Sequence, residues 1–261
     1  MPFTVSHAAV VLPFTRLLAR WRLLSAVVIG AMVPDFALFF PWKMARGQTH
    51  SVVGLFTFCL PWGLLTYWVF QYVIKRPVFE LLPDGAYARW RPVSSRANLS
   101  NIRQWLLAGF GVLAGAVSHL VLDAFTHEGA RGVRMLPLLD EPIVEYGGHY
   151  WRGVRLMQDG LSLLGLLIVC VFVWYGLRRD CEQPVQNRIL DAAERHRWVL
   201  SYTATALALS VAWFLYERFH GPWNKTPTMI ASLVAVCSLR GVATSLLCVS
   251  VVLSRRLRAA G

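Results

Sequence analysis

Charged residues are scarce in this 261-residue chain, since Asp, Glu, Lys and Arg together make up only 15% of it. A soluble domain usually carries about 25% charged residues and about 45–50% apolar ones. Here 56% of the residues are hydrophobic, and the mean hydropathy is +0.48. This composition excludes a disordered chain and argues against a soluble enzyme.

Cysteine is also infrequent, and its five residues do not form a readable disulfide framework. Four of them, Cys59, Cys170, Cys237 and Cys248, lie inside apolar runs, and Cys181 alone lies in a polar loop. An odd number of cysteines placed in this way argues against a small secreted scaffold held by disulfides.

The common catalytic and nucleotide-binding motifs are missing as well. The sequence has no GxSxG, no GxGxxG and no P-loop, so serine hydrolase, Rossmann and NTPase functions have no support. Acidic residues are few, and the net charge of +12 would indicate nucleic-acid binding in a soluble protein. Because the basic residues fall between apolar stretches, membrane topology explains them better, and we expect no nucleic-acid partner.

Long apolar stretches are abundant, and they predict an all-α, polytopic transmembrane helical bundle. A bilayer core needs roughly 20 mostly apolar residues per helix. Six stretches meet or approach that length: 23–41, 52–74, 104–125, 161–177, 198–217 and 229–253. Residues 7–20 are expected to form a short N-terminal membrane helix. The whole chain, 1–261, is interpreted as one integral-membrane domain.

The basic residues of the loops predict the orientation of these spans. Of the 26 Lys and Arg residues, 17 lie before the first span, in loops 75–103 and 178–197, and after the last span. The loops on the opposite side hold only eight. Cytoplasmic loops carry the excess of Lys and Arg. We therefore expect a multi-pass protein of the cytoplasmic membrane with its C-terminus in the cytoplasm.

Ionisable residues inside or beside apolar spans are costly, and each one is a candidate for function. The candidates are His7, Asp35, His50, His119, Asp123 and His127. The last three follow one another at intervals of four residues, which places them on one face of a helix. Imidazole nitrogens and carboxylate oxygens on one face can bind a divalent ion, of which Zn²⁺ is the most expected.

The candidates also fall at similar depth if the spans are straight helices. Asp35 follows Arg22 by 13 residues, and His119 follows Arg103 by 16. At 1.5 Å per residue, these separations are about 20 Å and about 24 Å. His7 precedes Arg20 by 13 residues, and His50 lies just before the second span. We therefore expect one polar pocket near the non-cytoplasmic interface.

Arg240 lies in the middle of the last apolar stretch. Three interpretations remain open for it: its side chain extends to the interface, pairs with an acid such as Asp159, or binds an anionic group of a substrate.

Four motifs, MPFTVSH, VIGAMVPDF, THSVVGLFTFCLPWG and GAVSHLVLDAFTHEG, carry a family resemblance. With them the chain resembles an uncharacterised family of bacterial integral-membrane proteins whose chains open MPFTxSH. That family is in turn similar to inner-membrane proteins described as metal-dependent hydrolases. The resemblance covers roughly residues 1–180, leaving 181–261 as two further spans. It implies that His7, Asp35, His50, His119 and Asp123 match the family's metal-site positions.

These observations predict a membrane-embedded, metal-dependent hydrolase of a lipid or a lipid-linked phosphoester or ester. Either Asp35 or Asp123 would act as the general base instead of as a ligand. His127 and Arg240 are the expected substrate-binding residues. The alternatives are a non-enzymatic protein with a structural metal site and a lipid-binding or transport protein.

Overall fold

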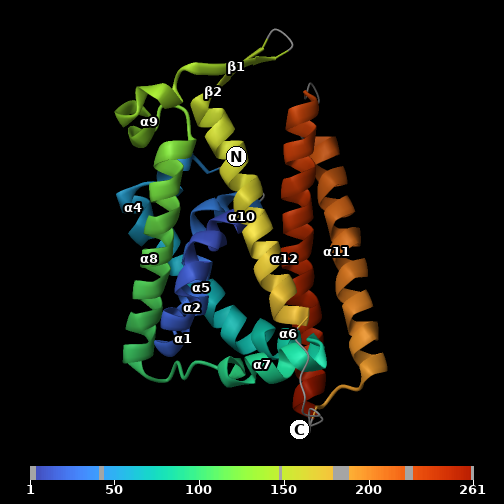
Figure 1. Cartoon of the computed structure of the whole chain (residues 1–261). Helices are drawn as coiled ribbons and strands as arrows, with labels where there is room; N and C mark the ends of the chain where they lie inside the picture. The colour runs from blue at the N-terminus through green and yellow to red at the C-terminus, as the bar shows by residue number, and fades with distance from the viewer. Residues whose placement is uncertain (1–3, 41–43, 147–148, 179–187, 221–225, 260–261) are drawn as a thin grey trace. The chain divides into compact units, whose positions relative to one another are not determined.

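The computed structural model of the protein describes residues 4–40, 44–146, 149–178, 188–220 and 226–259, and their regular structure is almost entirely helical (Figure 1). Among these residues, five helices are long and apolar enough to cross a membrane. They are Val52–Leu81, Ile102–Thr126, Gly153–Arg178, Ala192–His220 and Met229–Ala259. The prediction of an all-α membrane bundle is confirmed at this level, and the chain is a multi-pass membrane protein.

Four of the long helices are uninterrupted, and one is a composite. The uninterrupted helices are α8 (Ile102–Thr126), α10 (Gly153–Arg178), α11 (Ala192–His220) and α12 (Pro227–Ala259). The composite consists of α4 (Val52–Gly54), α5 (Leu60–Val69) and α6 (Lys75–Leu81), joined by the π-helical segments η3 (Leu55–Cys59) and η4 (Phe70–Ile74).

The predicted span 23–41 is not one helix. It consists of α2 (Leu24–Gly30) and the 3-10 helix η2 (Val33–Phe39), with a break between them. Pro34 explains the break, because proline has no N–H and its ring clashes with the carbonyl four residues earlier, which here is that of Gly30. The predicted count of six spans plus one short helix is therefore not confirmed.

The remaining elements are short. The N-terminal segment predicted as a helix over 7–20 is the 3-10 helix η1 (Thr4–Phe14) followed by α1 (Thr15–Arg20). The others are α3 (Arg46–Thr49), α7 (Asp84–Ser94), α9 (Arg131–Met135), η5 (Pro137–Leu139) and the antiparallel strands β1 (Pro142–Tyr146) and β2 (His149–Arg152).

Contacts divide the chain into two compact units. The first comprises Met1–Tyr67 and Ala97–Tyr175, and the second comprises Trp68–Arg96 and Gly176–Gly261. In the second unit, α11 and α12 lie side by side (Figure 1). No described residue of α11 is buried, as expected for an apolar helix whose surroundings are lipid.

In the first unit, α2 packs closely on α8 through small residues. A Cβ atom added to Gly30 would lie 2.1 Å from the carbonyl oxygen of Val112, and one added to Gly115 would lie 2.1 Å from that of Val27. Small residues allow this close approach of two membrane helices. The crossing places the last two turns of α8 beside the break that follows α2.

Candidate metal centre

A cluster of imidazole and carboxylate side chains lies inside the first unit, and four separate segments contribute to it. The structure brings together the five side chains predicted as metal ligands: His7 from η1, Asp35 from η2, His50 after α3, and His119 and Asp123 from α8. His50 is half-buried, and the other four are buried. His127, which follows the last residue of α8, lies against Asp123.

The break after α2 orients His119. In a continuous helix the carbonyl of Ala31 would accept from the N–H of residue 35, but the N–H of Asp35 donates to Met32 instead. The Nδ1–H of His119 donates to the Ala31 carbonyl at 2.8 Å, since a carbonyl oxygen can only accept. In the neutral ring this bond leaves a lone pair on Nε2, which is the arrangement found in metal-ligating histidines.

The Thr49-His50-Ser51 sequence orients His50 by the same principle. The Thr49 hydroxyl donates to the carbonyl of Arg46 and lies 2.7 Å from Nδ1 of His50. Because a hydroxyl has one proton to donate, Thr49 accepts from the Nδ1–H of His50, and Nε2 of this ring also keeps its lone pair. Ser51 then caps α4 by accepting from the N–H of Gly54 at 3.0 Å.

Asp123 lies at the centre of the cluster. Its carboxylate oxygens are 3.7 Å from Nε2 of His7, 3.4 Å from Nε2 of His50, 3.5 Å from Nε2 of His119 and 3.4 Å from Nδ1 of His127. The guanidinium of Arg46 forms an ion pair with Oδ2 of the same carboxylate.

Asp35 is the second carboxylate of the cluster. Its Oδ2 accepts a hydrogen bond from the hydroxyl of Thr4 at 3.0 Å. Its Oδ1 lies 3.4 Å from Nε2 of His50 and 3.7 Å from Nε2 of His119. The Thr4 bond therefore leaves the other oxygen directed at the two imidazoles.

Nδ1 of His7 has no hydrogen-bond partner among the described residues, and the same holds for the three ring nitrogens nearest the two carboxylates: Nε2 of His7, of His50 and of His119. All three face carboxylate oxygens at distances longer than a normal hydrogen bond. Buried nitrogen lone pairs directed at carboxylate oxygens repel each other unless a cation lies between them. That cation is either a set of protons on the rings or a metal ion.

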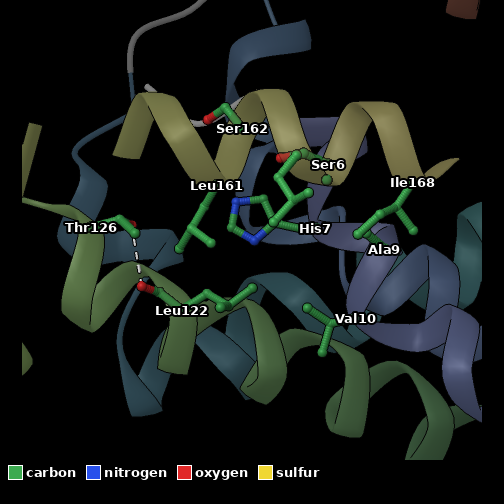
Figure 2. A pocket seen from close by; sticks show the side chains of 11 residues that line it. Ser6, His7, Ala9, Val10, Leu122, Thr126, Leu161, Ser162 and Ile168 are labelled. Atoms are coloured by element: carbon green, nitrogen blue, oxygen red, sulfur yellow. Dashed lines mark hydrogen bonds between the residues drawn. The ribbon is translucent and has the colours of Figure 1, made fainter. Parts of the chain in front are cut away.

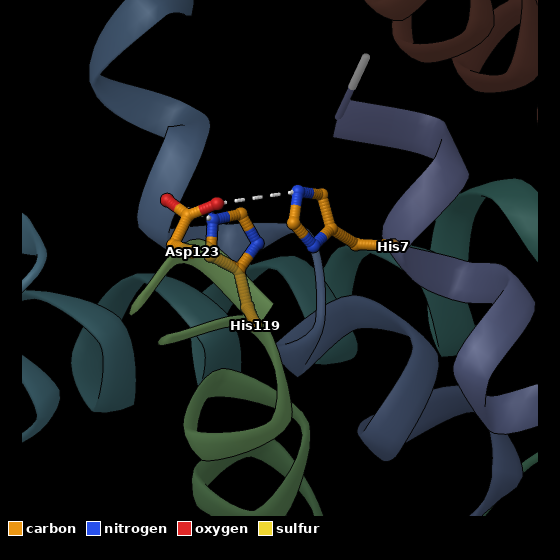
Figure 3. A group of neighbouring side chains, drawn as sticks. All are labelled: His7, His119 and Asp123. Carbon is orange, nitrogen blue, oxygen red and sulfur yellow. Dashed lines mark ion pairs between the residues drawn. The ribbon is translucent and has the colours of Figure 1, made fainter. Parts of the chain in front are cut away.

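The packing of the rings makes protonation of all of them costly. Figure 3 shows the rings of His7 and His119 beside the Asp123 carboxylate; the two rings are stacked, with centroids 3.8 Å apart and planes 17° apart. The ring of His50 meets that of His119 edge-on at 5.3 Å. Stacked imidazolium ions repel, so one divalent ion compensates the two carboxylates with less mutual repulsion.

Two overlapping triads have the composition and spacing of a metal site. One is His7, His119 and Asp123, and the other is Asp35, His50 and His119. In each triad the possible ligand atoms all lie within 4.8 Å of one another. Imidazole and carboxylate are the ligands of many zinc sites, and the Nδ1–H bonds of His119 and His50 supply the outer contacts that such ligands usually have.

His127 and Arg46 lie at the edge of the cluster, where their side chains are 20% and 45% exposed. Burial lowers the pKa of His127 below its usual value; the Asp123 carboxylate opposes this shift, and the Arg46 cation adds to it. The His127 ring is therefore neutral near pH 7. Its Nε2 has no hydrogen-bond partner among the described residues.

Three residues of the site were not among the sequence-predicted ones: Thr4, Arg46 and Thr49. Thr4 and Thr49 lie inside the MPFTVSH and THS motifs, so those motifs were the signal for them. Arg46 appeared in the sequence only as a basic loop residue, and nothing in the local pattern links it to Asp123, 77 residues later.

Arg240 belongs to the second unit. Its guanidinium donates to Glu217 at 2.8 Å and lies over the ring of Trp213, 4.9 Å from the centroid. Asp159, one of the acids considered for it, pairs with Arg155 instead. The binding of an anionic substrate group by Arg240 stays a prediction.

A comparison with models of protein families found one match. The model of a family described as Domain of unknown function (DUF4184) matches residues 1–253. The chain belongs to this family. The match extends past residue 180 and includes the helices of the second unit. No curated protein and no solved structure matches the chain. The description of this family names no activity.

Proposed function

We propose that the protein is a membrane-embedded, metal-dependent hydrolase that cleaves a phosphoester or ester bond of a lipid or lipid-linked substrate. The observation that supports this most directly is the set of three Nε2 atoms that have no hydrogen-bond partner among the described residues and lie beside two buried carboxylates. Such a set requires a compensating cation.

The residues that would hold the ion are those of the two triads, His7, Asp35, His50, His119 and Asp123. Two carboxylates and three imidazoles favour a divalent ion, and zinc is the most expected. When bound, such an ion lowers the pKa of a water molecule towards neutrality and polarises a phosphoryl or carbonyl oxygen.

The protein's own groups account for the rest of a hydrolysis. The water oxygen bonds to phosphorus or to the carbonyl carbon, the bond to the leaving oxygen breaks, and a proton passes from the water to that oxygen. Asp35 or Asp123 accepts the proton as general base. His127, neutral and at the edge of the cluster, is placed to contact the polar group of the substrate.

The substrate class follows from where the site lies. The cluster is buried among apolar helices, and His119 is 0% exposed. A water-soluble substrate would have to leave water to enter this buried site, whereas a membrane lipid would enter the site directly from the bilayer. We place the site near the outer face of a bacterial cytoplasmic membrane, following the excess of basic residues on the other side.

The orientation is testable by itself. A phosphatase reporter, active only outside the cytoplasm, and a fluorescent protein, active only inside it, would each be fused after Gly261. We expect fluorescence without phosphatase activity, because 17 of the 26 Lys and Arg residues would then face the cytoplasm. The opposite pattern would refute the orientation.

The hydrolysis is tested with the purified protein in vesicles of extracted bacterial lipid, supplied with Zn²⁺, Mn²⁺ or Mg²⁺. We expect one lipid class to be consumed, the consumption to stop with chelator, and activity to return when the ion is restored. Lipid and product are followed by mass spectrometry.

A structural metal is the second candidate, because the ligands come from four separate segments that an ion would clamp together. Tightly bound metal without consumption of any lipid would favour it over the hydrolase.

A further inference from the structure

A cavity of about 190 Å³ lies directly beside the cluster, entirely within the first unit. Residues of η1, α8 and α10 line it, and His7 belongs both to the cavity wall and to the metal-binding triad. Figure 2 shows the His7 imidazole between α10 and α8, with Leu161 and Leu122 beside it. The cavity therefore ends at the candidate metal centre.

The cavity wall is largely apolar, and its polar lining residues are Ser6, His7, Thr126 and Ser162. Most of its side chains are aliphatic, including those of Leu122, Leu161 and Ile168. The hydroxyls of Thr126 and Ser162 donate to carbonyls of their own helices, at 3.2 Å and 2.6 Å. An apolar wall of this kind suits a hydrocarbon, and cavities of about 150 Å³ lined by such residues bind benzene-sized molecules.

The cavity also reaches the outside of the protein between η1 and α10. Three of its lining residues are exposed on the protein surface: Val10 at 39%, Leu164 at 51% and Ile168 at 41%. Leu164 and Ile168 lie on α10, one of the helices long and apolar enough to cross a membrane, and in a membrane, lipid tails would surround them. The opening therefore faces sideways into the bilayer.

We infer that this cavity binds part of a lipid's hydrocarbon chain, next to its ester bond, with the remainder extending past Val10 and Leu164 into the bilayer. The part of this inference that makes the bound lipid a substrate rests on the proposed hydrolase function. Both a fatty-acyl chain and an isoprenoid chain have the required chemistry. A chain held here brings the first bonds of its head group to His7 and the Asp123 carboxylate.

The test uses a phosphatidylcholine with a photoreactive diazirine on one acyl chain, in vesicles with chelator present so that no metal or activity is needed. After illumination, labelled peptides are mapped by mass spectrometry. We expect labelling of 6–10 and 161–168 to exceed that of the exposed apolar face of α11. The labelling is repeated with an excess of unlabelled diacyl phospholipid or of unlabelled polyprenyl phosphate. The competitor that suppresses the labelling shows whether the cavity binds a fatty-acyl chain or an isoprenoid chain.

Two variants narrow the cavity, and one matched variant leaves it intact. Leu161→Trp fills the interior, and Leu164→Trp obstructs the exposed mouth without disturbing packed residues. Leu163→Trp is the control, because Leu163 is 71% exposed on the same helix and does not line the cavity. We expect the first two to reduce the labelling severalfold and the control to leave it unchanged.

Labelling that is even over α10 and α11, unaffected by Leu161→Trp and Leu164→Trp, or suppressed by neither competitor would overturn the inference. Specific labelling of a protein that consumes no lipid would support the cavity as a lipid site while contradicting the hydrolase.

Discussion

Replacing His119 and Asp123 together with alanine is expected to remove nearly all bound divalent metal from the purified protein. Both residues belong to the buried triad with His7, and His119 belongs to both triads. Their removal leaves His7 without a partner in its triad, and leaves Asp35 and His50 as a pair. Two ligands without a third rarely hold zinc in a protein site. The metal is measured by elemental mass spectrometry after purification in detergent without chelator.

The matched control removes the same two residue types away from the cluster. Asp159 pairs with Arg155 on the exposed side of α10, and His220 lies exposed at the end of α11. A variant with Asp159→Ala and His220→Ala should keep the metal content of the unmodified protein. Size-exclusion profiles verify that both variants are folded. Equal and negligible metal in all three proteins would refute the metal centre.

Asp35→Asn and Asp123→Asn are expected to abolish lipid hydrolysis with different effects on the metal. Asp123 contacts four imidazoles, so its amide variant should lose metal and activity together. Asp35 contacts two imidazoles, and Thr4 holds its other oxygen. Asp35→Asn should therefore keep most of the metal but, as a variant of the general base, lose about 10²–10⁴-fold in rate. Initial rates and metal content are measured on the same preparations.

The carboxylate control for this comparison is Asp159→Asn, which should leave both quantities unchanged. Loss of metal from both cluster variants would make Asp35 a ligand and not the base. Full activity of both would exclude the cluster from the reaction altogether.

Composition and periodicity were sufficient to predict most of the fold. The apolar runs at 52–74, 104–125, 161–177, 198–217 and 229–253 each lie within a helix long enough to cross a membrane, although the helices extend beyond the runs. A long run of apolar residues is enough to predict a membrane-spanning helix, because a helix satisfies its own backbone hydrogen bonds in lipid. The run 23–41 has the same composition, but Pro34 prevents a continuous helix there.

Ionisable residues are rare in apolar stretches, and the site residues could therefore be identified from the sequence. The interval of four residues also puts His119 and Asp123 on one face of α8, as the structure has them, whereas His127 lies just past the end of the helix and contacts Asp123 from there. A straight helix over 23–41 is the assumption behind the depth of Asp35, and that assumption is wrong. Asp35 reaches the cluster because the chain breaks after α2 and continues as a 3-10 helix.

The sequence by itself thus determined that this is a helical membrane protein and which polar residues its apolar segments contain, because both follow from the local cost of exposing polar groups to lipid. Only the tertiary structure decided how those residues face one another. The Ala31 carbonyl that orients His119, the Arg46 cation on Asp123 and the cavity beside His7 all join segments distant in the chain. Such contacts depend on how helices cross, and the crossing of α2 and α8 is set by the combined shape of both surfaces, which no single stretch of sequence contains.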